Sequence, residues 1–159
     1  MTLPVDLARQ TLEACRGRGQ MVATAESCTG GLVAASLTAV AGSSDVVDRG
    51  FVTYTNDAKM QMIGVTRATL EAYGAVSEQV AAEMAQGALA NSNAGIAVSI
   101  TGIAGPGGSE HKPEGRVCFG LATRTGCTTI TKEFGALGRA EVRLAATNCA
   151  LSALRDQRF

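Results

Sequence analysis

The sequence predicts an α/β fold: a mixed sheet with helices on both faces. Strand-like and helix-like segments alternate in the first part of the chain, and two strand-like segments then follow one another as a hairpin. Alternation is typical of parallel strands joined by crossover helices, whereas a hairpin adds antiparallel strands. The 159 residues contain no repeat with a period of about 20–50 residues and no linker, so we expect one domain over residues 1–159.

The first four elements are two helices and two strands. Residues 5–16 place apolar side chains at helical spacing, and the glycines that follow end this helix. The stretch QMVATA at 20–25 predicts a short buried strand. A helix is expected over 32–40, and GFVTYT at 50–55 predicts a strand because it is rich in β-branched and aromatic residues.

The middle of the chain predicts short helices with polar caps. Asn56 is a good N-cap for a helix over 57–63, which Gly64 stops. A second short helix over 66–73 is closed by Gly74. The remaining expected elements are, in order, a helix capped by Ser77 over 78–91, a strand over 95–100, a loop over 101–115, hairpin strands over 116–123 and 128–134, and a helix over 139–156.

Composition and charge exclude several classes of function. With 14 basic and 14 acidic residues the net charge is zero, whereas a non-specific nucleic-acid binder usually has a basic excess. No apolar run approaches the roughly 20 residues that span a bilayer. The start MTLPVDLARQ lacks the basic and apolar segments of a signal peptide. We therefore expect a cytoplasmic protein that binds neither nucleic acid nor a membrane.

The cysteines and the histidine bear on redox state and metal binding. The 5 cysteines are an odd number without CxxC spacing, and in a reducing compartment we expect free thiols. A zinc site draws on clustered histidines and cysteines, and the only histidine here is His111. We expect no cofactor and no metal held by protein side chains, although Mg²⁺ carried by a substrate stays open.

The loop ESCTGG, after the first predicted strand, is a candidate anion or oxyanion site. Its glycines let a ligand approach the backbone, and the following helix offers unpaired N–H groups. Ser27 is a candidate nucleophile, but Ser27 or Thr29 could instead only cap the helix. Cys28 is a second candidate, with a buried inert thiol as its alternative.

A serine nucleophile needs a base, and the chain offers two candidates. His111 lies in a polar loop, where solvent exposure is the simple alternative. Lys59 follows a buried-looking strand in TYTNDAK, where desolvation and a helix N-terminus would favour the neutral amine. Tyr54 could relay a proton or orient the pair. A solvated lysine and a core aromatic remain the alternatives for these two residues.

Two further features suggest an anionic ligand. The loop 101–115 is rich in glycine and is not a P-loop, so it is either a mobile surface loop or a lid or backbone cradle over a ligand. Arg139 and Arg143 lie four residues apart on the last predicted helix, where like charges repel. An anion between them would relieve the repulsion; two solvated arginines near Glu141 are the alternative.

Seven stretches occur in an order that resembles the CinA carboxy-terminal family of nicotinamide-nucleotide amidases. They are TAESCTGG, AGSS, RGFVTYTNDAK, IGV, YGAVSE, SITGIAGPGG and KPEGRV. Each is weak alone, but together they cover about residues 7 to 155 and are specific. The resemblance implies a three-layer α/β/α sandwich and a homodimer or higher homo-oligomer.

The resemblance also implies a reaction: hydrolysis of the carboxamide of nicotinamide mononucleotide to nicotinic acid mononucleotide and ammonia, in pyridine-nucleotide salvage. By motif, the implied catalytic residues are Ser27 as nucleophile, Lys59 in place of a histidine base, and Tyr54. The residues that we expect to bind the nucleotide substrate are Thr29, Gly30, Gly31, Asn56, Thr101, Gly102, Gly105 and Arg139.

Two departures from the family pattern leave a second function open. The family commonly has Lys-Pro-Val-Gly where this chain has Glu114 in KPEG, and a glutamate there could repel a phosphate unless it points to solvent. The stretch FGALGR keeps Arg139 but lacks the acidic or amide residue that often precedes it. The alternative is a non-catalytic paralogue that binds pyridine nucleotides without hydrolysing them.

Overall fold

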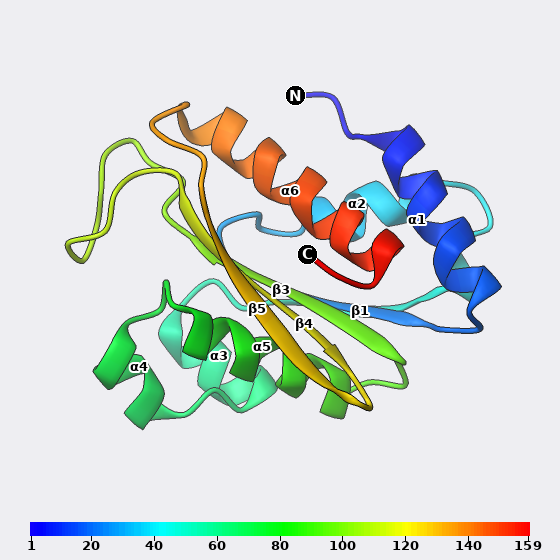
Figure 1. Cartoon of the computed structure of the whole chain (residues 1–159), viewed down its shortest axis with the longest axis horizontal. Coiled ribbons are helices and arrows are strands. Elements are labelled where there is room, and N and C mark those ends of the chain that lie inside the picture. Colours follow the sequence, from blue (N-terminus) through cyan, green and yellow to red (C-terminus); the bar gives the residue numbers. More distant parts are fainter.

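A five-stranded mixed sheet forms the centre of the computed structural model, which describes residues 1–159 (Figure 1). The strands are β1 Val22–Glu26, β2 Val47–Val52, β3 Ile96–Gly102, β4 Arg116–Thr123 and β5 Gly126–Glu133, in the order β2-β1-β3-β4-β5. β2, β1 and β3 are parallel, while β4 and β5 are antiparallel to their neighbours. The predicted mixed sheet and its hairpin are confirmed.

Three helices cover each face of the sheet and make three layers (Figure 1). One face carries α1 Val5–Gly17, α2 Leu32–Thr38 and α6 Arg139–Asp156. The other carries α3 Asn56–Ile63, α4 Arg67–Tyr73 and α5 Glu78–Ala90. A 3₁₀ turn at Ser43–Asp45 was not predicted. None of the helices combines the length and the apolar composition needed for a membrane span.

The strand predicted over 50–55 is displaced toward the N-terminus. β2 pairs with β1 and ends level with it, at the pair Glu26–Val52. Thr53 and Tyr54 therefore leave the sheet at its carboxyl edge, where their carbonyl groups become available to a side chain. The displacement matters for function, because these two carbonyls belong to the candidate site described below.

The N-cap of α3 was also predicted one residue too late. The hydroxyl of Thr55, not the side chain of Asn56, accepts the hydrogen bond from the N–H of Ala58 at 3.0 Å. Thr55 has extended backbone dihedrals, as a capping residue requires, and Asn56 is the first helical residue. The predicted cap at Ser77 is confirmed, because its hydroxyl accepts from the N–H of Val80.

The two faces of the sheet carry side chains of different size. Strand residues on the α6 face are large, such as Val98 and Ile100, whereas the α5 face presents Ala23, Ala25 and Ala97. Small side chains let a helix lie close to a sheet. α5 uses this room, since a Cβ at Gly120 would come within 2.5 Å of the carbonyl oxygen of Ala81.

Gly87 in α5 lies against the end of α3, and its replacement is expected to affect stability. A glycine inside a helix costs about 1 kcal/mol relative to alanine, so its presence needs a packing reason. Here a Cβ would collide with the carbonyl oxygen of Ile63, at the end of α3. We expect Gly87→Ala to lower the free energy of unfolding by about 1–3 kcal/mol, measured by urea denaturation. A substitution that raises stability instead would show that α3 does not pack this closely.

Candidate active site

A small pocket opens where the carboxyl ends of β1 and β3 meet the loops that follow them. Its volume is about 190 Å³. It is lined by Ser27, Cys28, Tyr54, Asn56, Lys59, Ala75, Val76, Thr101, Gly102, Ala104 and Arg139. Ligands of open α/β sheets bind at this edge. Seven of the residues expected from the sequence meet here, although they come from segments far apart in the chain.

Ser27 and Lys59 lie in direct contact at the bottom of this pocket. Ser27 Oγ and Lys59 Nζ are 3.0 Å apart and hydrogen-bonded. The N–H of Ser27 donates to the carbonyl of Ile100 in β3, which ties the residue to the sheet. Lys59 is the fourth residue of α3, and its amine reaches Ser27 just after the end of β1. The predicted nucleophile and base are therefore within the distance at which a proton can be transferred.

Burial changes the acid–base behaviour of Lys59. Its side chain is only 1% exposed, and this desolvation lowers its pKa from 10.5 to about 8. Cys28 and Glu110 oppose the shift through their charges but do not cancel it. Lys59 forms no ion pair with a carboxylate that would hold the amine in its charged form. The alternative of a solvated surface lysine is thus wrong.

Two carbonyl groups fix the orientation of the Lys59 amine. Nζ donates to the carbonyl of Thr53 at 3.0 Å and to that of Tyr54 at 3.1 Å. A neutral amine has two N–H bonds and one lone pair. In the structure Nζ donates to Ser27 Oγ, which itself donates to the carbonyl of Tyr54 at 3.4 Å. When the amine is neutral and both its N–H groups point to the two carbonyls, its lone pair is left for the proton of Ser27 Oγ. The arrangement is that of a serine hydroxyl beside a general base.

Tyr54 lies at the mouth of the pocket rather than at its bottom. Its side chain is 57% exposed, and its hydroxyl accepts a hydrogen bond from Arg139 at 2.8 Å. Arg139 also donates to the carbonyl of Gly105 at 2.7 Å, so it links the mouth to the loop after β3. The hydroxyl of Tyr54 forms no hydrogen bond with Ser27 or Lys59, and its catalytic role stays a prediction.

The two arginines of α6 do not hold one site between them. Arg143 donates to the carbonyls of Cys28 at 3.0 Å and Thr29 at 3.2 Å, neither of which Arg139 contacts. The predicted anion between the two guanidinium groups is therefore not needed to explain their spacing. Arg139 is instead hydrogen-bonded to the carbonyl of Gly105 and the hydroxyl of Tyr54, and Arg143 to two carbonyls of the turn after Ser27.

Glu26 holds the start of α2 and was not predicted to have a role of its own. Its carboxylate is buried and accepts from the N–H groups of Gly31, Val33 and Ala34 at 3.3, 2.9 and 3.0 Å. Gly30 N–H donates to the carbonyl of Ser27. The N–H groups of Gly30 and Gly31, expected to bind substrate, are thus already hydrogen-bonded. Thr29, Gly30 and Gly31 are also absent from the pocket lining.

The loop after β3 is tied down at two points beside the pocket. Lys112 Nζ donates to the carbonyls of Tyr73 and Val76, and Val76 lines the pocket. Glu114 accepts from the N–H groups of Gly107 at 2.7 Å and Gly138 at 3.0 Å. The Glu114 carboxylate thus bridges the loop and the start of α6.

The remaining predicted residues have the following positions. Thr101 and Gly102 line the pocket from the end of β3, and the hydroxyl of Thr101 donates to the carbonyl of Ala75. Asn56 lines the mouth, whereas Gly105 lies outside the lining and contacts Arg139. His111 is exposed, in a loop conformation with φ of 63°.

Cys28 is a poor competitor of Ser27 for the role of nucleophile. Its side chain is buried, and burial raises the pKa of the thiol to about 12. A thiol attacks as its thiolate, which this environment disfavours. All the cysteines are free, as expected. No group of three or more His, Cys, Asp or Glu side chains could hold a metal ion.

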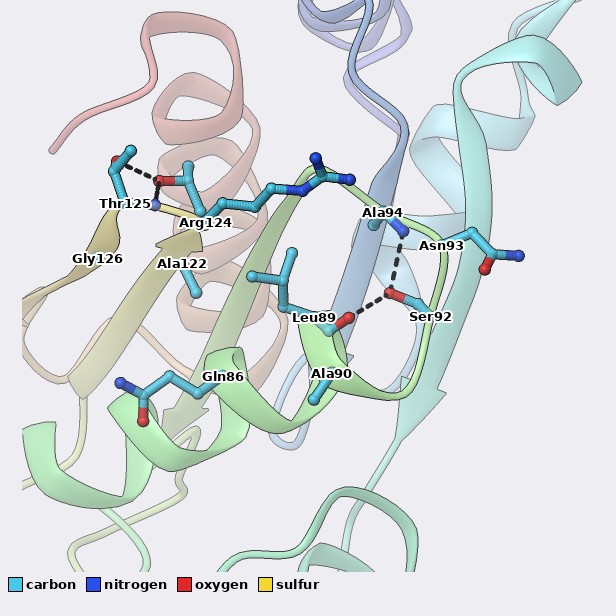
Figure 2. Close-up of a pocket in the computed structure, with 11 residues that line it drawn as sticks. Gln86, Leu89, Ala90, Ser92, Asn93, Ala94, Ala122, Arg124, Thr125 and Gly126 are labelled. Carbon is cyan, nitrogen blue, oxygen red and sulfur yellow. Dashed lines mark hydrogen bonds between the residues drawn. The ribbon is translucent and has the colours of Figure 1, made fainter.

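A larger hollow lies at the opposite end of the sheet and has a different character. Its volume is about 720 Å³, and Figure 2 shows Arg124 extending from the β4–β5 turn toward Ala94. The hydroxyls of Ser92 and Thr125 in its lining are hydrogen-bonded to nearby groups of the chain. It contains neither a nucleophile–base pair nor any residue predicted from the sequence, so the smaller pocket is the candidate active site.

Comparisons of sequence and of structure with known proteins point to the same family. The family model of the CinA C-terminal domain matches residues 5–158. The nicotinamide-nucleotide amidohydrolase PncC of Escherichia coli (strain K12) is 53% identical over 96% of this chain and 93% of the relative. A putative competence-damage inducible protein of Caldicellulosiruptor saccharolyticus is 47% identical over 94% of this chain, but over only 36% of its own length.

Solved structures agree with this grouping. The competence/damage inducible protein CihA from Agrobacterium tumefaciens superposes with a TM-score of 0.92 and 52% identity, over 97% of this chain and 96% of that one. A protein from Klebsiella pneumoniae subsp. pneumoniae, described as competence damage-inducible protein A, superposes with a TM-score of 0.92 and 38% identity, over 96% and 94%.

Proposed function

Because the chain belongs to the CinA C-terminal domain family, we propose that it is an amidohydrolase that converts nicotinamide mononucleotide to nicotinic acid mononucleotide and ammonia. Its place would be in pyridine-nucleotide salvage. The observation that carries the proposal is the contact of Ser27 Oγ with the buried amine of Lys59 at 3.0 Å. A buried serine–amine pair in a pocket is an arrangement suited to acyl transfer.

In the proposed mechanism, Ser27 Oγ attacks the carboxamide carbon while neutral Lys59 takes its proton. The tetrahedral intermediate collapses, the carbon–nitrogen bond breaks, and the proton on Lys59 passes to the departing ammonia, with help from Tyr54. A water molecule then attacks the ester on Ser27, again with Lys59 as base. The products are the free carboxylic acid and the restored Ser27 hydroxyl. The proposed reaction therefore uses only the substrate, water and the side chains of the protein.

The size of the pocket fits only part of the proposed substrate. Pockets that enclose a drug-sized ligand measure about 300–1,000 Å³, whereas this one has about 190 Å³. The pyridine ring and its carboxamide would enter, and the ribose and phosphate would lie across the mouth. There the exposed side chains with polar groups are those of Tyr54, Asn56 and Arg139. We propose that the phosphate binds beside Arg139.

One observation favours the non-catalytic alternative. Glu114 takes the N–H groups of Gly107 and Gly138, which an incoming phosphate would otherwise be free to use. A site that keeps this carboxylate would bind a phosphate less tightly, as the departure from the family pattern suggested. Incubation of the pure protein with nicotinamide mononucleotide separates the two functions: steady release of ammonia supports the enzyme, whereas saturable binding without ammonia supports the binding protein.

The acidity of Lys59 predicts how the activity depends on pH. Only the neutral amine can act as the base, so the active fraction of the enzyme increases as the pH rises through the pKa of about 8. We expect kcat/KM to rise about tenfold per pH unit well below this value and to level off above pH ~9. Ammonia release at pH 6 to 10 measures the profile. A flat profile, or a decline from pH 6 to 8, would contradict the assignment of Lys59 as the base.

A further inference from the structure

We propose that Arg143 is a positioning residue: it fixes the turn after Ser27 so that the N–H groups of Cys28 and Thr29 receive the oxyanion formed during the attack. The inference rests on the proposed hydrolysis and specifies how this site stabilises its transition state. Arg143 lies on α6, outside the pocket lining, and acts only through the main chain of the turn.

Hydrogen bonding around the turn leaves only two donors free. The N–H of Ser27 donates to Ile100, and that of Gly30 to the carbonyl of Ser27. Those of Gly31, Val33 and Ala34 donate to Glu26, and that of Leu32 to the carbonyl of Thr29. The N–H groups of Cys28 and Thr29 donate to no group of the chain, although both residues are buried. A buried N–H without a partner is rare and needs an explanation.

Arg143 sets the direction of the Thr29 N–H, and Gly30 sets that of the Cys28 N–H. Its Nε donates to the carbonyl of Cys28 at 3.0 Å and its Nη2 to that of Thr29 at 3.2 Å. The peptide bonds of the turn are trans, so each N–H points opposite to the carbonyl of the same peptide group. The Thr29 N–H therefore points away from Arg143. The Cys28 N–H points away from the carbonyl of Ser27, which Gly30 holds.

The position of the turn matches the place where the oxyanion forms. Cys28 follows the nucleophile directly and lines the pocket with it. The guanidinium packs against Gly30, and a Cβ added there would lie 3.3 Å from Nη2. Gly30 also has a backbone φ of +58°, which other residues rarely adopt. Arg143 forms no ion pair with a carboxylate, so its charge is directed to the two carbonyls alone. Glu26 holds the other side of the turn through the α2 N–H groups.

Fixed donors aimed at an oxyanion act on the transition state and not on the bound substrate. Loss of one such donor typically lowers kcat about 10²–10³-fold. Arg143→Ala leaves both N–H groups in place but removes the contact that orients the Thr29 N–H and holds the turn. We therefore expect kcat to fall about 100-fold with KM changed less than about twofold. The midpoint of the pH profile should stay near 8, because Arg143 is not among the groups that set the pKa of Lys59.

The test measures kcat, KM and the pH profile of ammonia release for the wild type, Arg143→Ala and Arg143→Lys. Guanidinium chloride at tens of millimolar is added to each, because Arg143 is partly exposed and the space it leaves in Arg143→Ala can admit the free ion. We expect partial recovery of kcat in Arg143→Ala and an intermediate kcat in Arg143→Lys. Arg124→Ala, at the far end of the sheet, is the matched control and should behave as wild type with or without guanidinium.

Each outcome separates this inference from the function on which it rests. A wild-type protein that releases no ammonia overturns both. An active wild type together with an Arg143→Ala variant whose kcat is within twofold overturns only the role of Arg143. A loss of kcat that comes with a large rise in KM, and that guanidinium does not reverse, shows a general disruption of the fold and also overturns it. A selective, reversible loss of kcat supports it.

Discussion

Replacement of Ser27 by alanine is expected to lower the rate of ammonia release from nicotinamide mononucleotide by about 10³-fold or more, as with other nucleophile deletions. The change removes only Oγ, which lies 3.0 Å from Lys59 Nζ, and leaves the main-chain hydrogen bond of Ser27 to Ile100 in place. Substrate binding should change little, so the loss should appear in kcat. A coupled ammonia assay at saturating substrate measures it.

The neighbouring Cys28 provides the comparison for this result. Because burial raises the pKa of its thiol to about 12, we expect Cys28→Ala to keep the larger part of the activity. Its N–H group, the part that the mechanism uses, is retained in alanine. If Ser27→Ala keeps nearly wild-type ammonia release while Cys28→Ala loses it, the thiol is the nucleophile and the assignment of Ser27 is wrong.

Replacement of Lys59 by methionine is expected to produce a loss of similar size, about 10³-fold in kcat. Methionine fills much of the same buried volume, but it cannot accept the proton of Ser27 Oγ. The steep increase of kcat/KM with pH should disappear in the residual activity, because the group whose pKa of about 8 governs it is gone.

An arginine at position 59 distinguishes a base from a fixed positive charge. The guanidinium stays protonated in proteins, since its pKa exceeds 12, so it keeps the charge of a lysine but cannot take a proton. If Lys59 acts as the base, Lys59→Arg should be as inactive as Lys59→Met. An arginine variant with activity within tenfold of the wild type would show that position 59 supplies charge and not a proton acceptor.

Much of the fold followed from patterns that are local in the sequence. The helix predicted over 139–156 has these same bounds, and Gly64 ends α3 in a left-handed conformation, as a glycine stop predicts. The boundaries of β2 were less well predicted, because they depend on its register with β1 rather than on the composition of 50–55. The cap at Thr55 was missed because Thr and Asn are both good N-caps and the sequence alone does not choose between them.

The candidate site could be predicted as a set of residue types, but not as a network of contacts. Ser27 and Lys59 stand out because a small polar turn and a lysine follow two strands that end at the same edge. The buried carboxylate of Glu26 had a signal that could have been used: an acidic residue between an apolar strand and the start of a helix. The proposed role of Arg143 had no such signal in the sequence, because Arg143 contacts residues more than 110 positions away.

Titration of the Lys59 side chain by NMR tests the central claim most directly, because it measures the base without relying on turnover. Lysine labelled with ¹³C at Cε gives few signals in this chain, and the signal of Lys59 is identified by its loss in Lys59→Met. A midpoint near pH 8, matching the rise of kcat/KM, is the predicted result. A midpoint at the ordinary value of 10.5 would show a charged amine at neutral pH and would contradict the assignment of Lys59 as the base.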